Sequence, residues 1–219
     1  MIILNHKSNL HEVTRWQMIN ASRQKSPDRF AKRVKYSPKD FRTVDFEDLF
    51  EEDRFTWRTR VHGESDYICT ISFEGAFEYL KYNLSSMRGK NRWKRITINM
   101  VAEALSKSLD SEDLYVDCGC PDFKYRFAFW CTQDDCKYGL PQNTPPKVRN
   151  VNNNKGYVCK HLLALLYGKR WVRSAAKAWL DYMRANPDLT EYYIWGKKIE
   201  SDYPEEDEEL DNDELADNN

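Results

Sequence analysis

Two neighbouring segments alternate between apolar and polar residues with a period of two. In RFTWRTRV, 54–61, every second position from Phe55 to Val61 is Phe, Trp, Thr or Val, and Arg or Thr occupy the positions between. DYICTISF, 66–73, alternates in the same way. This period is typical of half-buried strands, and the HGES turn between the segments predicts a β-hairpin. Cys69 belongs to the inward set of the second strand, so we expect a packed thiol there.

Elsewhere apolar residues recur every three or four positions, which is the period of an amphipathic helix. Segment 113–118 reads as a short strand, and 121–130 begins with a proline, which suits a first helical turn. The pattern therefore predicts an α+β fold, a small antiparallel sheet packed with helices, in one domain over 54–199. The segments with the helical period are 74–87, 97–109, 159–168, 169–187 and 188–195.

The regions outside this domain have weaker patterns. Residues 1–53 are predicted to form an N-terminal arm: 9–24 can form a short helix, but 25–41 has two Ser-Pro dipeptides and no clean period, which indicates an extended arm or loop. Residues 134–157 are rich in Pro, Asn and Gly and predict a long loop, of a length that is usually functional or mobile.

The charge is distributed unevenly along the chain. The net charge is −1, but the last 20 residues, 200–219, hold 11 of the 35 acidic residues and no Lys or Arg. All 34 basic residues therefore lie in the preceding 199 residues, against the other 24 acidic ones. A basic body with an acidic tail can bind an acidic partner or shield itself with its own tail. A disordered, solubilising tail is the simpler interpretation.

Composition also indicates the cellular compartment in which the protein is expected. No run approaches the roughly 18–20 apolar residues of a membrane span, and the opening MIILNHKSNL is too short for the apolar region of a signal peptide. We therefore expect no membrane association and a reducing cytosol. In that setting six cysteines favour metal binding or packing over disulfides.

The pair Cys118-Gly119-Cys120 is best explained by metal binding. A disulfide is poor, because Cα atoms two residues apart on a strand are about 6.6 Å from each other, at the upper edge of the roughly 4.4–6.8 Å range. Redox pairs more often have two residues between the thiols. Side chains at i and i+2 do project to one side of a strand, as two metal ligands require.

A second pair of the same spacing follows after 38 intervening residues, where Cys159 and His161 open a helix. Together with Cys118 and Cys120 they make a Cys₃His set, typical of a closed structural zinc site. The competing interpretation is unpaired packed cysteines and a surface histidine. Cys131 and Cys136 have no accompanying ligands and are interpreted as incidental.

An enzyme is not predicted. The sequence has no phosphate-cradling glycine loop, and a closed metal site keeps no position for water. Cysteine–histidine catalysis through Cys159 and His161 is disfavoured by the accompanying Cys-x-Cys pair. The acidic residues Glu51 and Glu52 are interpreted as a solvated face.

The Cys-x-Cys…Cys-x-His set resembles the SWIM-type zinc finger, and Cys118, Cys120, Cys159 and His161 match it position by position. The spacer is longer than in most SWIM fingers and contains the extra segment PDFKYRFAFW. More broadly, DLYVDCGCPDFKYRFAFW followed by VCKHLLALL resembles a group of proteins of tailed bacteriophages, crAss-like phages among them, over residues 66–195.

That resemblance implies a place in the virion, as a structural subunit of the head–tail connector, a ring or the tail. The implied partners are portal, ring or tail proteins and further copies of this chain in a ring, with assembly in the host bacterial cytoplasm.

The alternative function is nucleic-acid binding, which is associated with SWIM fingers. The segment RGKNRWKR supplies five basic side chains, no acidic residue and a tryptophan that can stack on a base. A solvated helix end with its loop is the plainer interpretation of the same segment. The candidate contact residues, for DNA or another acidic partner, are Arg88, Lys90, Arg92, Trp93, Lys94 and Arg95.

Overall fold

The computed structural model describes residues 13–42, 46–62, 65–145 and 156–196. Within them one antiparallel sheet has the strand order β1-β2-β3-β4, so that each strand pairs with its neighbour in sequence. The strands are β1 (Ser37–Arg42), β2 (Arg54–His62), β3 (Tyr67–Glu74) and β4 (Leu114–Cys118).

The other elements of the described residues are α-helices and two short 3₁₀ helices that pack against this sheet or against one another. The fold is therefore the predicted mixture of helices with an antiparallel sheet. The helices are α1 (Arg15–Lys25), α2 (Pro27–Lys32), α3 (Phe46–Glu51), α4 (Ala76–Leu84), α5 (Ile98–Ser111), α6 (Pro121–Arg126), α7 (Ala128–Gln133), α8 (Lys160–Gly168), α9 (Trp171–Ala185) and α10 (Pro187–Trp195), with the 3₁₀ helices η1 (Arg33–Lys35) and η2 (Arg92–Arg95).

The predicted hairpin is confirmed as β2 and β3, which pair antiparallel. Phe55 lies opposite Phe73 and Trp57 opposite Ile71, and all four side chains are fully buried. The alternation read from the sequence therefore places its apolar side chains against the core. Cys69 is fully buried as well.

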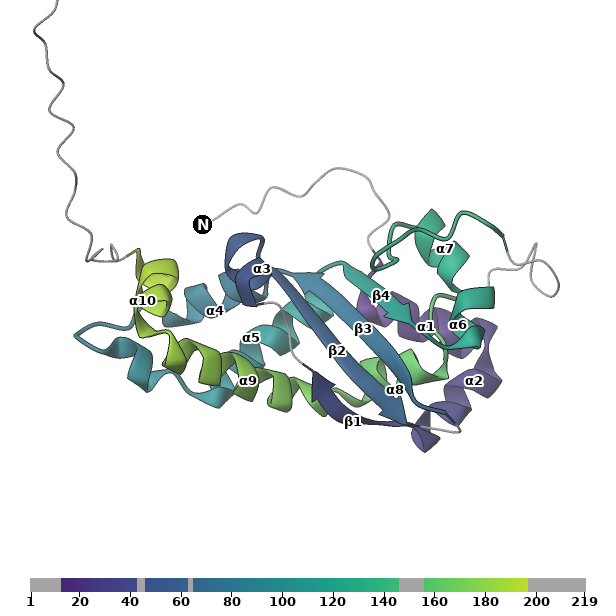
Figure 1. The fold of residues 1–219 in the computed structure, drawn as a ribbon, viewed down its shortest axis with the longest axis horizontal. Helices are drawn as coiled ribbons and strands as arrows, with labels where there is room; N and C mark the ends of the chain where they lie inside the picture. The colour runs from purple at the N-terminus through teal and green to yellow at the C-terminus, as the bar shows by residue number, and fades with distance from the viewer. Residues whose placement is uncertain (1–12, 43–45, 63–64, 146–155, 197–219) are drawn as a thin grey trace, which may run out of the picture.

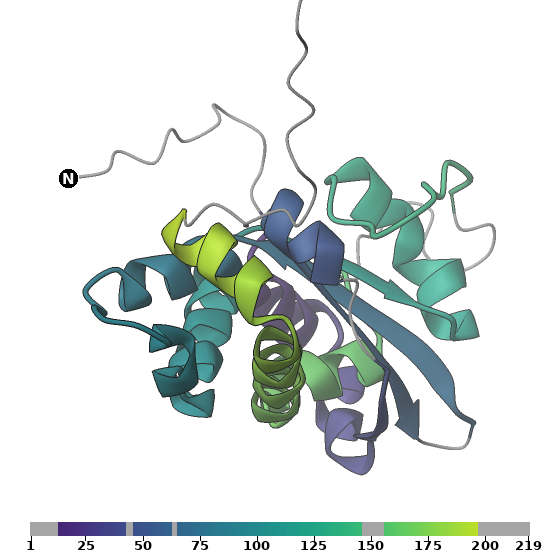
Figure 2. The ribbon, with the colours of Figure 1, turned by 60° about the vertical axis from the view of Figure 1, so that its left-hand side comes forward.

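The main helical layer covers one face of the sheet. Figures 1 and 2 show α5, α8 and α9 together on this face, and α6 and α7 on the opposite side beside β4. Aromatic rings join α9 to β2: the ring of Trp57 stacks on Trp171, with centroids 5.8 Å apart, and Phe55 approaches Trp179 at 6.1 Å. Such ring pairs add to the free energy gained by burying their area. Among the helices in the described residues, none is long and apolar enough to cross a bilayer.

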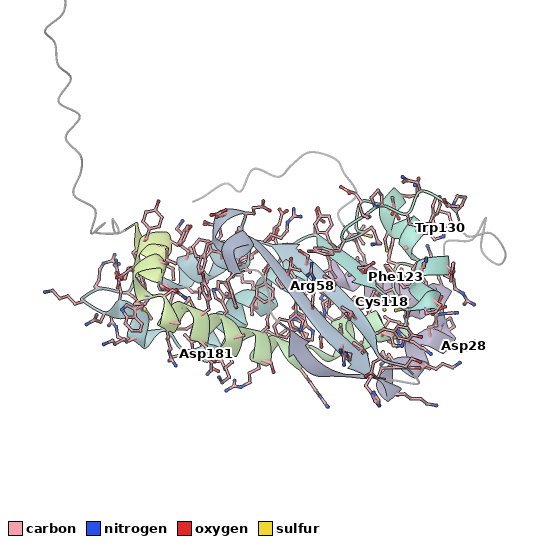
Figure 3. All side chains as sticks on the ribbon, viewed as in Figure 1. Asp28, Arg58, Cys118, Phe123, Trp130 and Asp181 are labelled. Atoms are coloured by element: carbon pink, nitrogen blue, oxygen red, sulfur yellow. The ribbon has the colours of Figure 1, made fainter. Side chains whose placement is uncertain are left out.

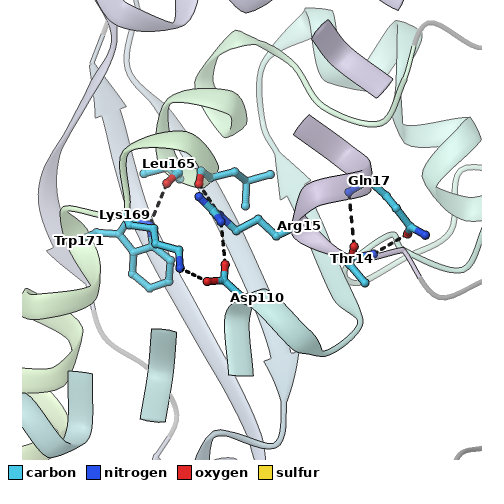
Figure 4. Close-up of polar contacts among 8 residues, drawn as sticks. Thr14, Arg15, Gln17, Asp110, Leu165, Lys169 and Trp171 are labelled. Atoms are coloured by element: carbon cyan, nitrogen blue, oxygen red, sulfur yellow. Dashed lines mark hydrogen bonds and ion pairs between the residues drawn. The ribbon is translucent and has the colours of Figure 1, made fainter. Parts of the chain in front are cut away.

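Helix α1 belongs to the domain core, contrary to the predicted N-terminal arm. It begins with a capping box, in which the Thr14 hydroxyl accepts from the Gln17 amide and the Gln17 side chain accepts from the Thr14 amide at 2.8 Å. Its side chains Met18 and Ile19 are 0% and 2% exposed. Figure 4 shows this cap beside the polar contacts of Arg15.

Arg15 is buried and joins three helices. Its Nε donates to the carbonyl of Leu166 at the end of α8 at 2.6 Å, and its Nη1 donates to the Asp110 carboxylate on α5 at 2.7 Å. Lys169 donates to the other oxygen of Asp110, and the Trp171 indole donates to the carbonyl of Leu165 at 3.1 Å (Figure 4). Burial lowers the pKa of Arg15, and Asp110 opposes that shift.

The segment after α1 also differs from the prediction of an extended arm. It forms α2, η1 and β1, and β1 pairs antiparallel with β2, with Arg42 opposite Arg58. Pro38 is tolerated because β1 is an edge strand. The arm prediction is therefore wrong for residues 13–42, since their packing depends on partners far away in sequence. Residues 1–12 and the acidic tail lie outside the described residues.

One further prediction needs correction near β4. The helical segment predicted at 121–130 is divided into α6 and α7 at Phe127. The beginning of the predicted long loop lies along β4, because the Val116 amide donates to the carbonyl of Cys136 at 2.9 Å and the Tyr138 amide donates to the carbonyl of Val116 at 3.0 Å. The middle of that loop, 146–155, lies outside the described residues.

Asp53 connects the start of β2 to α4. Its backbone has a positive φ of 51°, a conformation that Asp tolerates better than most residues. Its carboxylate accepts from the amides of Phe77 at 2.7 Å and Glu78 at 3.4 Å and so caps α4. Burial raises the pKa of Asp53 to about 6, against the lowering effect of these two amides. The neighbouring Glu51 and Glu52 are exposed.

Candidate metal centre

The four residues predicted from spacing converge in space. The ligand atoms of Cys118, Cys120, Cys159 and His161 all lie within 4.8 Å of one another, and each residue is 3% exposed or less. Figure 3 labels Cys118 at the end of β4, next to Phe123 of α6. The prediction that these four form one cluster is confirmed, and the cluster can hold a metal ion.

The first pair is positioned by the end of the sheet. Cys118 is the last residue of β4, and the amide of Gly119 donates to the carbonyl of Ile68 at 3.0 Å, which keeps the chain in line with β3. Cys120 then caps α6, its sulfur accepting from the Phe123 amide at 3.2 Å. An amide aimed at this sulfur favours the thiolate that a metal requires.

The second pair is positioned by the start of α8. Cys159 is the N-cap of this helix, and its carbonyl accepts from the Leu163 amide at 2.9 Å. His161 follows in the first turn and directs Nδ1 toward the sulfurs, 3.7 Å from Cys159 Sγ and 3.9 Å from Cys118 Sγ.

These separations fit a tetrahedral zinc ion. With Zn–S of about 2.3 Å and Zn–N of about 2.0–2.1 Å, the edge between a sulfur and a nitrogen of a tetrahedron is about 3.6 Å. The two measured separations, 3.7 and 3.9 Å, are close to this edge. Three thiols and one imidazole nitrogen are also the donor set of structural zinc sites.

The electrostatics of the cluster favour a cation. Burial raises the pKa of Cys159, and the contact with Cys120 raises that of Cys118, so both thiols resist ionisation in the protein alone. Hydrogen bonds from Cys118 and Cys159 lower the pKa of Cys120. Three sulfur ligands can be ionised together when a metal ion supplies compensating charge, since coordination deprotonates a thiol outright.

A fourth cysteine, outside the set of four candidate ligands, contacts the cluster. Cys69 lies opposite Cys118 in the β3–β4 register, and its Sγ donates to Cys118 Sγ at 3.4 Å. Burial raises the pKa of Cys69, so it stays a protonated donor. The predicted packed thiol therefore also orients a ligand, as outer-shell groups of metal sites do. The sequence alone could reveal this role only if the β3–β4 pairing were known.

Two tyrosine rings hold the imidazole of His161. The Tyr36 ring meets it edge to face with centroids 4.7 Å apart, and the Tyr67 ring lies at 5.1 Å. Tyr36 comes from the region predicted to be an arm. That region therefore contributes to the surroundings of the cluster, which sequence reasoning missed.

Cys131 and Cys136 form a separate buried pair. The Cys131 thiol donates to the carbonyl of Tyr157 at 3.1 Å, and burial raises its pKa. Across the described residues, the cluster of Cys118, Cys120, Cys159 and His161 is the one group found that could hold a metal ion.

The predicted basic segment lies at the other end of the molecule. Figure 1 shows α4 and α10, which flank it, far from β4 and α8. Arg92 pairs with Glu191 on α10 at 3.3 Å and lies 4.2 Å above the Trp195 ring. Trp93 is half-buried, so its ring is only partly available for stacking. The remaining basic side chains are exposed: Arg88, Lys90, Lys94 and Arg95.

Comparison with protein-family models, with curated proteins and with solved structures finds no match for this chain.

Proposed function

We propose that this protein is a zinc-stabilised structural subunit of a tailed-phage virion, in the head–tail connector, a ring or the tail, and not an enzyme. The observation that carries the structural role is the burial of four converging protein ligands, each 3% exposed or less. Four protein ligands complete a tetrahedral zinc site and leave no open position for water or substrate. When bound, zinc supplies the bonds that hold the end of β4 to the start of α8.

The virion role is supported by the sequence resemblance over residues 66–195. The surface supplies apolar side chains for contacts with neighbouring subunits, among them Ile68 at 57% exposed and Leu140 at 88%. We expect portal, ring or tail proteins, or further copies of this chain, to cover such positions in the particle.

The test is whether the protein is a component of the purified phage particle. We expect it to co-sediment with intact particles through a density gradient, at a fixed copy number and with one zinc per copy. A protein found only in the lysate of infected cells, and absent from particles that contain all other structural proteins, would contradict the virion role.

Nucleic-acid binding is the second candidate, favoured by the exposure of Arg88, Lys90, Lys94 and Arg95. Contacts of basic side chains with phosphates release counterions, so binding would weaken steeply as salt is raised. Replacing Lys90 and Lys94 by Gln would reduce the salt dependence by about one unit of slope for each lost phosphate contact. Binding to DNA that is unchanged by both salt and these substitutions would contradict this candidate.

A further inference from the structure

A cavity lies between η1 and the end of α8. It has a volume of about 240 Å³ and is lined by aromatic and basic side chains, with few other polar groups. The residues that matter for its chemistry are Arg33, Tyr36, Tyr167, Arg170 and Trp171.

Two aromatic rings and a backbone carbonyl fix the position of the Arg33 guanidinium in the protein alone. Its central carbon lies 3.8 Å from the centre of the Phe30 ring and 4.1 Å from that of Tyr167. Nη1 donates to the carbonyl of Phe30, whereas Nε is buried and has no hydrogen-bond partner among the described residues. A guanidinium fixed between two rings loses little rotational freedom when it binds an anion, which favours binding.

The positive charge of the cavity is not compensated within the described part of the chain. Neither Arg33 nor Arg170 forms an ion pair with a carboxylate there. Asp110 of α5, which contacts Lys169 directly after α8, is already paired with Arg15 and Lys169. Two arginines therefore line one cavity, and neither has a carboxylate partner among the described residues.

We propose that this cavity binds a phosphate monoester carried on a planar ring, as in a nucleoside monophosphate. Two guanidinium groups carry two positive charges, which match a phosphate dianion better than a single carboxylate. Each guanidinium is planar and can donate two parallel hydrogen bonds to a pair of phosphate oxygens. Tyr36 and Tyr167 also line the cavity and carry hydroxyls that can donate, and aromatic rings suit a planar base. The source of this group is either a free nucleotide or the 5′-terminal phosphate of a nucleic-acid strand.

The cavity and the metal centre share two structural elements. Helix α8 begins at the metal ligands and ends at the cavity, and Tyr36 contacts both the His161 ring and the cavity. We therefore expect removal of the metal to abolish phosphate binding, whereas substitutions in the cavity leave the metal in place. The proposal does not depend on the virion role, because it rests on these residues alone.

The experiment is calorimetric titration of the full, zinc-loaded chain with AMP, inorganic phosphate and adenosine at constant ionic strength. AMP is expected to bind once per chain and more tightly than either fragment. Arg170→Gln should weaken AMP binding by about tenfold or more, the loss typical of a charge-assisted hydrogen bond. Arg170 is exposed, so we expect this variant to fold. Arg33→Gln should show a similar loss.

The matched control is Arg173→Gln, which removes the same charge from an exposed position on α9 that contacts Asn99 and does not line the cavity. It should bind AMP as the unmodified protein does. Equal weakening by the Arg170 and Arg173 variants would overturn the proposal, because general charge would then explain binding. Absence of binding at about 10 mM AMP, or equal binding of glutamate, would also overturn it.

A second arm identifies the source of the phosphate. Short oligonucleotides that differ only in a 5′-phosphate or a 5′-hydroxyl are compared on the same protein. Tighter binding of the phosphorylated strand, lost in Arg170→Gln, assigns the cavity to strand ends. Binding of AMP alone assigns it to free nucleotides. Equal binding of both strands with no binding of AMP would contradict the proposal and point to backbone contacts elsewhere.

Discussion

Short sequence motifs predicted two sites at opposite ends of this molecule: the Cys₃His cluster, here the metal end, and the segment 88–95, here the basic end. The two ends are built differently. At the metal end, ligands from β4 and α8 meet in the interior and are supported by Cys69 and two tyrosine rings. At the basic end, η2 is held by the pair of Arg92 with Glu191, and its other charges face solvent.

The difference shows what a motif can specify. Burying three thiols and an imidazole together costs free energy unless a metal ion or mutual hydrogen bonds satisfy them, so their convergence indicates a site. Charges close together in sequence carry no such constraint, because water satisfies each of them separately. The contrast between the two ends therefore predicts large effects for substitutions at the first and small ones at the second.

The largest effect is expected from Cys159→Ser. The free energy contributed by structural zinc is about 10–16 kcal/mol in finger peptides, and whole domains are stable by about 5–15 kcal/mol. We therefore expect the variant to lose its zinc and most of its resistance to urea. Elemental analysis and urea unfolding measure these two quantities.

The control for that variant is Cys136→Ser, at a buried cysteine outside the cluster. It should keep one zinc per chain and lose about 1–3 kcal/mol, the penalty for burying a hydroxyl in place of a thiol. Zinc content and stability in Cys159→Ser equal to those of Cys136→Ser would refute the metal centre.

An intermediate effect is expected from Arg15→Met, which removes the contact between α1 and the end of α8. The Leu166 carbonyl loses a donor and Asp110 keeps only Lys169, at a cost of about 2 kcal/mol, reduced because Asp110 is 35% exposed. Thermal or urea unfolding measures the loss. Arg23→Met, at an exposed position on the same helix, should stay within about 0.5 kcal/mol of the unmodified protein. Equal losses in the two variants would argue against a special role for Arg15.

The smallest effect concerns Asp53, which caps α4 at the basic end. Its pKa in the folded protein is about 6, above its usual value of 3.8, so between these values the folded state binds more protons than the unfolded state. Stability should therefore fall as the pH rises from about 4 to about 6, by about 1 kcal/mol or less at this partly solvated carboxylate.

Asp53→Asn removes the titrating group and keeps an oxygen that accepts from the Phe77 amide. Urea unfolding across this pH range should show a flatter dependence in the variant than in the unmodified protein. The same slope in both proteins would show that Asp53 does not titrate in this window.

Local patterns predicted the elements whose partners are near in sequence. The alternation in 54–61 and 66–73 gave the hairpin, and ligand spacing gave the metal cluster, because thiols and an imidazole have few other reasons to be paired in this way. The sequence did not predict that helix α1 lies in the core. Its buried side includes a charged residue, Arg15, whose partners lie 95 and 151 positions away in the sequence. The support of His161 by Tyr36 was hidden for the same reason.

The large sequence separation between Arg15 and its partners affects when helix α1 can pack during synthesis of the chain. Its carbonyl partner on α8 is synthesised 151 residues later, and the last metal ligand only five residues before that partner. Contacts between distant segments are closed late, after the entropy of the intervening loop has been overcome. Helix α1 can therefore dock only after α8 has been made, so its docking and the assembly of the Cys₃His cluster fall at the same late moment of biosynthesis.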